Sequence, residues 1–253
     1  MRLARTPVLL LALLALAAQA EAAGGLFLRW NKCYGDGGLQ SKAFACDTNA
    51  GNAFLTAGFE LGVDLGQVSG NEIVLELAAT GSSWPAWWAF RNPGTCRMTS
   101  MSINSVFDAT STVCVDWEQA NAVAGVTAYD IGVRGANTAR LVAALAMPLD
   151  LLQDLSAGQE YFAFNIFISR SKTVGAGACG GCATPVCLLL ASINVTTPVL
   201  ANSQKLSGPG NTVDSDFVTW QGGAGVVVGG AIGCPAATPV QQRTWGTVKA
   251  LYH

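Results

Sequence analysis

Cysteine is the residue type in this sequence with the clearest chemical potential. The 253 residues include eight cysteines: Cys33, Cys46, Cys96, Cys114, Cys179, Cys182, Cys187 and Cys234. Three of them, at positions 179, 182 and 187, stand at the entrance to an apolar run, residues 186–195, that contains no charged residue. With Cys234 as a fourth ligand they match a tetrahedral, all-thiolate zinc or iron site. Cys179 and Cys182 also have the CxxC spacing of thiol redox proteins.

The start of the chain favours a third interpretation, structural disulfides. Arg2 and Arg5 precede an apolar run over residues 8–18, and Ala18-Gln19-Ala20 matches the small-x-small pattern that signal peptidases cut. We therefore predict that residues 1–20 are a signal peptide and that the protein is secreted, either extracellular or periplasmic. In such compartments an even number of cysteines indicates disulfides, so we expect no metal ion and no cofactor.

Sequence spacing suggests how the cysteines pair. The first two would close a turn-rich loop, the next two would fasten a hairpin, and the last four would join the glycine-rich segment near the C-terminus to the apolar run. Four cysteines allow three connectivities, and the sequence does not choose securely among those of the last four. The preferred pairs are Cys33–Cys46, Cys96–Cys114, Cys179–Cys187 and Cys182–Cys234.

Histidine-dependent catalysis is disfavoured because the sequence contains one histidine, His253, at its last position. A terminal residue is usually too mobile to hold a proton-transfer geometry, so a Ser/His/Asp or Cys/His arrangement is not expected.

Acid pairs are the remaining enzymatic route. Glu72 and Glu76 share one face of a predicted strand at a separation of about 13 Å, whereas glycosidase carboxyl groups lie about 5–10 Å apart, so we interpret both as part of a solvated face. Two other pairs, Glu60 with Asp64 and Asp214 with Asp216, carry no recognisable signature. The loop residues Asp36, Asp47 and Asn49 are interpreted as turn formers, since a calcium site would need further oxygen ligands. We predict that the protein is not an enzyme, with a carboxylate-based glycan-active enzyme as the least favoured alternative.

Aromatic side chains offer a binding alternative. Trp84, Trp87 and Trp88 form the densest aromatic cluster in the sequence. Packing at one end of a β-sandwich is the favoured interpretation, because aromatic rings bury large apolar areas. In the alternative, exposed indoles form a platform that stacks on sugar rings, and the protein is a carbohydrate-binding module.

Charge limits the candidate partners. Removing the signal peptide leaves 253 − 20 = 233 residues, with 12 basic and 16 acidic side chains, a net charge of −4. Nucleic acids and anionic membranes attract basic surfaces, so neither is expected as a partner. The signal's apolar run is also shorter than the roughly 20 residues of a spanning helix, so no membrane anchor is expected after cleavage. Polysaccharide or another surface protein remains as a candidate partner.

The elements that would position these residues are mostly short strands. Alternating apolar residues predict strands over 24–34, 72–79, 161–169, 216–221 and 244–252. Residues 186–195 have the pattern of a strand buried on both faces, and we expect it to lie next to the strand at 161–169. Residues 137–148 favour a strand over a short helix. Roughly nine to eleven strands with turn signals about every ten residues predict an antiparallel, jelly-roll-like β-sandwich stapled by disulfides. We expect residues 21–253 to form one domain.

Three short stretches carry a resemblance. LFLRWNKC at residues 26–33, the CxxC followed by PVC at 179–187, and TWGTVKALY at 244–252 resemble segments of small exported bacterial proteins of uncharacterised function. The resemblance implies export and no particular activity.

Overall fold

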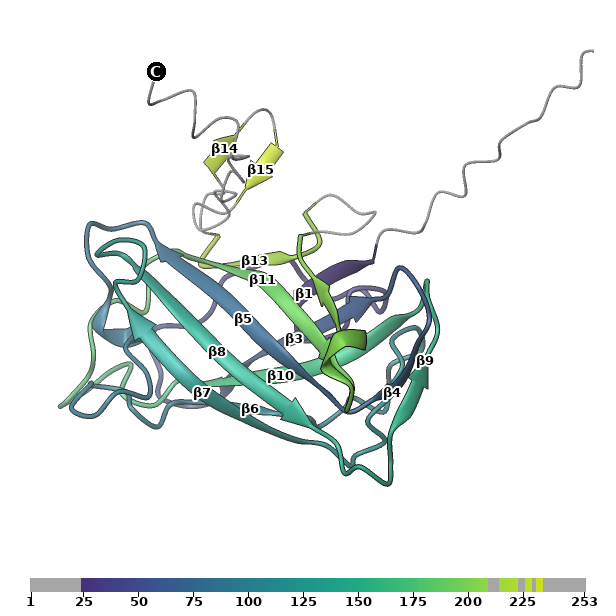
Figure 1. The fold of residues 1–253 in the computed structure, drawn as a ribbon. Coiled ribbons are helices and arrows are strands. Elements are labelled where there is room, and N and C mark those ends of the chain that lie inside the picture. Colours follow the sequence, from purple (N-terminus) through teal and green to yellow (C-terminus); the bar gives the residue numbers. More distant parts are fainter. Residues whose placement is uncertain (1–23, 209–213, 223–225, 229–230, 234–253) are drawn as a thin grey trace, which may run out of the picture.

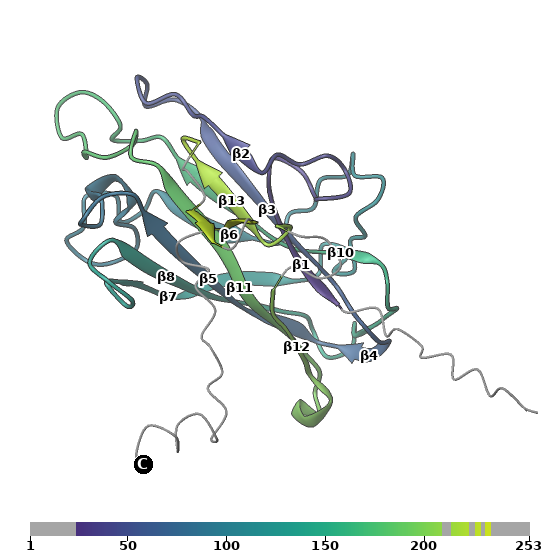
Figure 2. The same ribbon diagram turned by 90° about the horizontal axis from the view of Figure 1, so that it is seen from above.

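The protein is an all-β sandwich, as the strand pattern predicts. The computed structural model describes residues 24–208, 214–222, 226–228 and 231–233. Figures 1 and 2 show the strands of one sheet stacked on those of a second. The smaller sheet, sheet A, has the order β1-β3-β10-β6, and the larger, sheet B, has the order β2-β13-β11-β5-β8-β7 with β12 also paired to β11.

Sheet A is antiparallel throughout. Its strands are β1 (Gly25–Trp30), β3 (Asn52–Glu60), β10 (Glu160–Ser169) and β6 (Met101–Asn104). The predicted strand over 161–169 is therefore confirmed. Its pairing with residues 186–195, however, was wrong, because those residues belong to sheet B.

Sheet B is antiparallel except where β13 meets β2. Its strands are β2 (Ser41–Lys42), β13 (Phe217–Trp220), β11 (Val186–Thr196), β5 (Gly70–Ala79), β8 (Thr138–Ala146), β7 (Val123–Ile131) and β12 (Gln204–Leu206). The predicted strand within residues 137–148 is confirmed as β8. It lies between β5 and β7, where cross-strand pairing outweighs the helix propensity of its alanines and leucines.

Four short strands complete the described structure. The strands β4 (Leu65–Val68) and β9 (Gln153–Leu155) pair with each other, as do β14 (Val226–Val228) and β15 (Ala231–Gly233). Two single-turn 3₁₀ helices are also present, η1 (Ala86–Trp88) and η2 (Leu200–Asn202). Among the described residues, no helix combines the length and the apolar character needed to cross a membrane.

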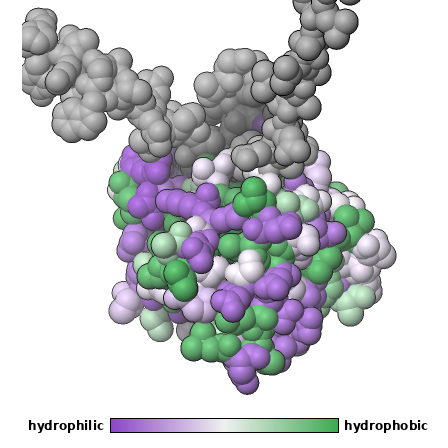
Figure 3. All heavy atoms as spheres, turned by 45° about the vertical axis from the view of Figure 1, so that its right-hand side comes forward, coloured by the Kyte–Doolittle hydropathy of each residue, from purple (hydrophilic) through white to green (hydrophobic). Residues whose placement is uncertain are grey.

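The core lies between the two sheets and follows strand alternation. Leu26, Leu28 and Trp30 of β1 point inward, as do Ile73, Leu75 and Leu77 of β5, all 3% exposed or less. Because successive side chains of a strand point to opposite faces, each strand contributes every second residue to this core. On the face turned forward in Figure 3, hydrophobic and hydrophilic residues are interspersed rather than gathered in one extended apolar patch.

A β-bulge in β10 changes which residues face outward. The register with β3 shifts between Phe162 and Phe164, so Ala163 is an extra residue on one strand. Phe164 joins the main core, whereas Phe162 packs outside it with Cys33 and Cys114. Simple alternation predicts that both phenylalanines share a face, and the bulge makes that prediction wrong.

The disulfides connect distant parts of the chain. Cys33 pairs with Cys114, Cys46 with Cys182 and Cys96 with Cys179, at sequence separations of 81, 136 and 83 residues. Cys187 is also disulfide-bonded, and no described cysteine is a free thiol. The prediction of disulfides in place of thiolate ligands is thus confirmed for these seven residues.

The predicted pairs themselves were wrong. Cys33–Cys46, Cys96–Cys114, Cys179–Cys187 and Cys182–Cys234 are all excluded by the observed connectivity. The predicted pairs close short loops, whereas the sandwich brings together loops that are 81 to 136 residues apart in sequence. A hairpin between Cys96 and Cys114 is also absent, since β6 is the only described strand in that segment.

Several predictions fall outside the described residues. These are the signal peptide at 1–20, the strand at 244–252, and the residues Cys234 and His253.

Candidate functional site

A groove lies on the outer face of sheet A. Two loops, residues 31–38 and 105–115, stand over the strands β3 and β10 and enclose a cavity of about 240 Å³. We call this cavity the outer groove. Its lining residues are Asn31, Lys32, Cys33, Asp36, Phe54, Thr56, Val106, Phe107, Asp108, Ser111, Phe162 and Asn165.

Polar side chains from neighbouring strands form the floor of the outer groove. Thr56 of β3 lies opposite Asn165 of β10 in the ladder, and its Oγ1 donates to Asn165 Oδ1 at 2.8 Å. Asn165 Nδ2 donates in turn to the carbonyl oxygen of Val106 at 2.6 Å, which fixes one wall to the floor. The bulge at Ala163 is the reason that Phe162 and Asn165 both face this side of the sheet.

Aromatic rings border the polar floor. Phe54 is 39% exposed and meets Phe167 edge to face, with ring centroids 4.6 Å apart. Phe107 meets the buried ring of Phe162 in the same manner at 5.4 Å. The outer groove therefore offers accessible aromatic surface beside amide and hydroxyl groups.

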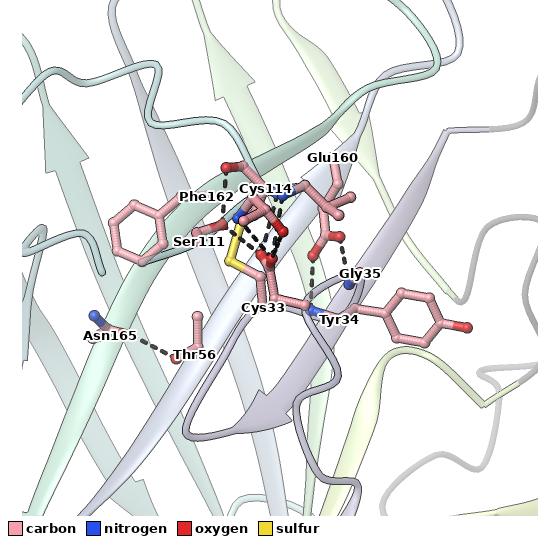
Figure 4. Close-up of a disulfide and its surroundings, with 12 residues drawn as sticks. Cys33, Tyr34, Gly35, Thr56, Ser111, Cys114, Glu160, Phe162 and Asn165 are labelled. Atoms are coloured by element: carbon pink, nitrogen blue, oxygen red, sulfur yellow. Dashed lines mark hydrogen bonds between the residues drawn. A yellow bond between two sulfur atoms is a disulfide. The ribbon is translucent and has the colours of Figure 1, made fainter. Parts of the chain in front are cut away.

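A disulfide joins the two loops that wall the groove. The Cys33–Cys114 bond connects residues 31–38 to residues 105–115, and both cysteines pack on Phe162. Figure 4 shows this bond between the floor residues Thr56 and Asn165 on one side and Glu160 on the other. The walls are thus covalently fixed to each other above β10.

Two carboxylates reinforce this connection. Asp36, from the first loop, accepts hydrogen bonds from the hydroxyls of Ser111 and Thr112 and from the backbone N–H groups of residues 112–114. Glu160, from β10, accepts the N–H groups of Tyr34 at 2.9 Å and Gly35 at 2.8 Å. We call the disulfide with these two carboxylates the clasp.

The two carboxylates have opposite pKa shifts. Partial burial alone would raise the pKa of Asp36, but hydrogen bonds from Ser111, Thr112 and Cys114 together hold it well below its usual value. Burial raises the pKa of Glu160, against the effect of the hydrogen bonds from Gly35 and Tyr34. Asp36 is therefore ionised across the physiological pH range, where its charge is held by five hydrogen bonds.

Other polar groups of the groove remain available. Asn31 has a positive φ of 75°, a conformation that asparagine tolerates better than most residues. Its Oδ1 accepts from Lys42 Nζ, while its amide N–H groups have no acceptor among the described residues. Asp108 accepts from Thr110 through Oδ1, and its Oδ2 and the ammonium of Lys32 also have no hydrogen-bond partner within the described ranges.

This arrangement suits binding better than proton transfer. The carboxylates of the clasp are occupied by N–H and O–H donors, so neither is aimed at a substrate as a general base. Cys33, Cys114 and Glu160 bring three potential metal-ligand atoms within 4.8 Å of one another. Both sulfurs, however, are bonded to each other and offer no thiolate to a metal.

No family model, curated protein or solved structure matches this chain.

The predicted tryptophan platform divides into buried and partly buried members. Trp87 and Trp88 are 0% exposed and contact the ring of Trp220 at centroid distances of 5.0 and 5.2 Å. They therefore pack in the core, as the favoured interpretation had it, and present no surface to a sugar. Trp84 is half-buried, and its Nε1 donates to the carbonyl oxygen of Trp88.

Local backbone geometry explains why both adjacent indoles point inward. Trp87 and Trp88 lie in η1, whose single turn directs neighbouring side chains into the same core region. The N–H of Trp87 donates to the carbonyl oxygen of Gly180, and Gly181 has a φ of 104° with Pro85 against its Cα. A Cβ at Gly181 would lie 2.4 Å from the Cβ of Pro85, so the Gly-Gly spacer of the CxxC allows this close approach.

The predicted acid pairs do not meet in the groove. Glu72 is exposed, but Glu76 is 2% exposed and bonded to Arg140 at 2.6 Å, so the interpretation of Glu76 as part of a solvated face was wrong. Asp64 accepts the N–H of Ala157, and Asn49 accepts the N–H groups of Thr173 and Val174. Both side chains thus connect loops that are distant in sequence, and Asn49 does so instead of only forming its own turn.

Residue spacing alone did not predict the outer groove. One signal was present: Phe54 and Thr56 alternate with the apolar Ala53, Leu55 and Ala57, which marks an outward face carrying an aromatic and a polar residue. The contributions of Asn31 and Asp108 depend on the Cys33–Cys114 bond and could not be found by spacing.

Proposed function

We propose that this protein is a secreted, non-enzymatic binding module and that the outer groove is its contact surface. The observation that carries the proposal is the combination of exposed aromatic surface at Phe54 with polar groups of Asn31 and Asp108 that have no partner among the residues the structure describes. Pockets that bind small molecules have this composition, an apolar lining with a few polar groups that fix orientation.

Rigidity of the walls supports the proposal. The Cys33–Cys114 bond and the hydrogen bonds of Asp36 hold the two loops in one relative position. A site that is fixed before the ligand arrives loses less conformational entropy on binding. A purely structural loop contact would not need to leave a cavity of about 240 Å³ between its walls.

Secretion is supported by two independent features. The sequence begins with a signal-peptide pattern, and the described cysteines are all disulfide-bonded. Disulfides persist in oxidising compartments and are rare where glutathione keeps thiols reduced. Expression of the full sequence, followed by N-terminal sequencing of exported protein, tests this part, and a retained N-terminus would contradict it.

A thermal-shift screen against a chemically diverse fragment library tests the binding part. Fragments that occupy the outer groove raise the Tm of the wild-type protein by mass action. They should not raise the Tm of Phe54→Ala, while Leu200→Ala, which truncates a residue that is 76% exposed on η2, should respond like wild type. If no fragment is sensitive to Phe54→Ala, the proposed function is wrong.

A further inference from the structure

We infer that the ligand of the outer groove is a neutral saccharide. This inference rests on the proposed function and adds the chemical class of the ligand. It also places carbohydrate recognition on sheet A, away from the buried indoles of Trp87 and Trp88.

Aromatic surface beside planar polar groups favours a sugar ring. A pyranose has a face rich in C–H bonds and an edge rich in hydroxyls, so it fits a site with both kinds of surface. Phe54 and Phe107 supply the apolar surface in the groove. The amide of Asn31 supplies a donor, and Oδ2 of Asp108, which accepts no hydrogen bond in the described part of the chain, supplies an acceptor; a hydroxyl can bond to both.

The floor argues against a purely apolar ligand. Thr56 and Asn165 are bonded to each other, and Asn165 retains a second amide N–H after its bond to Val106. An apolar ligand would remove this N–H from water without giving it an acceptor, which costs free energy. A hydroxyl group would accept it.

Charge argues for a neutral ligand. The side chains of Lys32 and Asp108 have opposite charges and line the same groove, and Asp36 adds a negative charge that is already solvated by five hydrogen bonds. Asp108 would repel a phosphate or carboxylate ligand and Lys32 would repel a cationic one, while the charge of Asp36 is compensated by its own hydrogen-bond donors. The groove therefore favours neither an anionic nor a cationic ligand, and this balance suits an uncharged polyol.

Backbone pairing argues against an extended peptide. Peptides often bind by adding a strand to a free sheet edge. Beneath the groove, however, β3 is paired on both sides, with β1 and β10, and β10 is paired with β3 and β6. The floor therefore presents side chains rather than free main-chain N–H and C=O groups.

The volume of the outer groove limits the length of the ligand that it can enclose. The cavity of about 240 Å³ lies just below the range of about 300–1,000 Å³ that is typical of pockets for drug-sized ligands. A space of this size suits a short saccharide, with further units of a longer chain extending into solvent.

Calorimetric titration of the wild-type protein with neutral mono- to tetrasaccharides tests the inference. The panel includes glucose, galactose, mannose and N-acetylglucosamine with their oligomers, and glucuronic acid and glucosamine serve as charged analogues. We expect at least one neutral oligosaccharide to bind and its charged analogues to bind more weakly.

Two variants locate that binding. Asn31→Gly removes the amide while keeping a backbone that accepts φ 75°, so it leaves the loop conformation intact. Phe54→Ala removes the exposed ring. Each variant should lower the affinity for the neutral saccharide at least about tenfold, and Leu200→Ala should leave that affinity unchanged.

The outcomes separate this inference from the proposed function. If library fragments bind in a manner sensitive to Phe54→Ala but no neutral saccharide does, the saccharide class is wrong and the binding module stands. A preference for glucuronic acid or glucosamine also overturns the inference. If neither fragments nor saccharides depend on Phe54 and Asn31, both proposals fail.

Discussion

The backbone N–H of Tyr34 donates to Oε1 of Glu160 at 2.9 Å, across 126 residues of sequence. The other carboxylate oxygen of Glu160 accepts the N–H of Gly35 at 2.8 Å. Through these two bonds β10 holds the loop at residues 31–38, which is the first wall of the outer groove. Figure 4 shows both bonds next to the Cys33–Cys114 disulfide, which ties the second wall, residues 105–115, to the first. The geometry of the groove therefore depends on residues that do not line its interior.

Removing the Glu160 carboxylate should loosen this wall. Glu160→Ala leaves the N–H groups of Tyr34 and Gly35 without their acceptor, which should lower the free energy of unfolding by about 1–3 kcal/mol. Urea denaturation measures the change. The matched control is Glu72→Ala, an exposed glutamate bonded only to Asn194 among the described residues, which should change stability by no more than about 0.5 kcal/mol. Equal effects of the two substitutions would contradict the role given to Glu160.

The disulfide of the clasp should make a larger contribution. Cys33 and Cys114 are 81 residues apart, so their bond restricts the unfolded chain strongly. The double variant Cys33→Ala/Cys114→Ala should lose about 2–5 kcal/mol of unfolding free energy, measured by urea denaturation. Non-reducing digestion with mass spectrometry should also recover a 33–114 peptide pair from the wild type. Recovery of Cys33 linked to Cys46 would contradict the observed connectivity.

Glu118 should make stability depend on pH. It is fully buried, neither of its carboxylate oxygens meets a donor in the described part of the chain, and burial followed by repulsion from Asp116 raises its pKa to about 9. The folded state thus binds a proton that the unfolded state releases near pH 4.5. Stability must therefore fall as pH rises from that value toward 9, with a slope of up to about 1.4 kcal/mol per pH unit.

Glu118→Gln should abolish this slope. The amide is uncharged at every pH, so the stability difference between the variant and the wild type should shift in favour of the variant between pH 6 and pH 9. Urea denaturation at pH 6, 7.5 and 9 gives the comparison. A difference that stays constant over this range would show that Glu118 does not titrate as its burial implies.

Arg97 should matter more than an exposed arginine. It is 1% exposed, its guanidinium lies 3.5 Å from the ring centroid of Trp87, and it donates to the carbonyl oxygens of Trp87 and Ser169. Arg97→Met leaves those carbonyls without their donor and should cost about 2–4 kcal/mol of unfolding free energy. The control Arg134→Met truncates an exposed arginine and leaves buried Glu76 its bond to Arg140, so it should cost about 1 kcal/mol or less. A cost for Arg97→Met as small as that of the control would contradict this account.

Sequence periodicity predicted the strands well for a physical reason. The two-residue repeat of a strand is local, so the alternation over residues 161–169 and 72–79 could be read directly and is confirmed by β10 and β5. The bulge at Ala163 was not predictable in this way, because one extra residue is defined only relative to the partner strand.

The disulfide pairs and the binding site could not be predicted from the sequence for a related reason. Pairing Cys33 with Cys46 assumed that neighbours in sequence are neighbours in space, whereas the sandwich places Cys33 beside Cys114 and Cys46 beside Cys182. The outer groove combines residues from both sides of the Cys33–Cys114 bond, so it could not be predicted without the correct pairing. Composition did predict the burial of Trp87 and Trp88, since large aromatic rings contribute most to a core of this size.

Binding in the outer groove can be located by NMR, from the amide chemical-shift changes caused by a fragment or saccharide that raises the Tm. We expect the largest shifts on Asn31, Thr56, Asp108 and Asn165, and we expect them to vanish in Phe54→Ala but to persist in Leu200→Ala. Shifts centred on other residues, or a map unchanged by Phe54→Ala, would contradict binding in the outer groove.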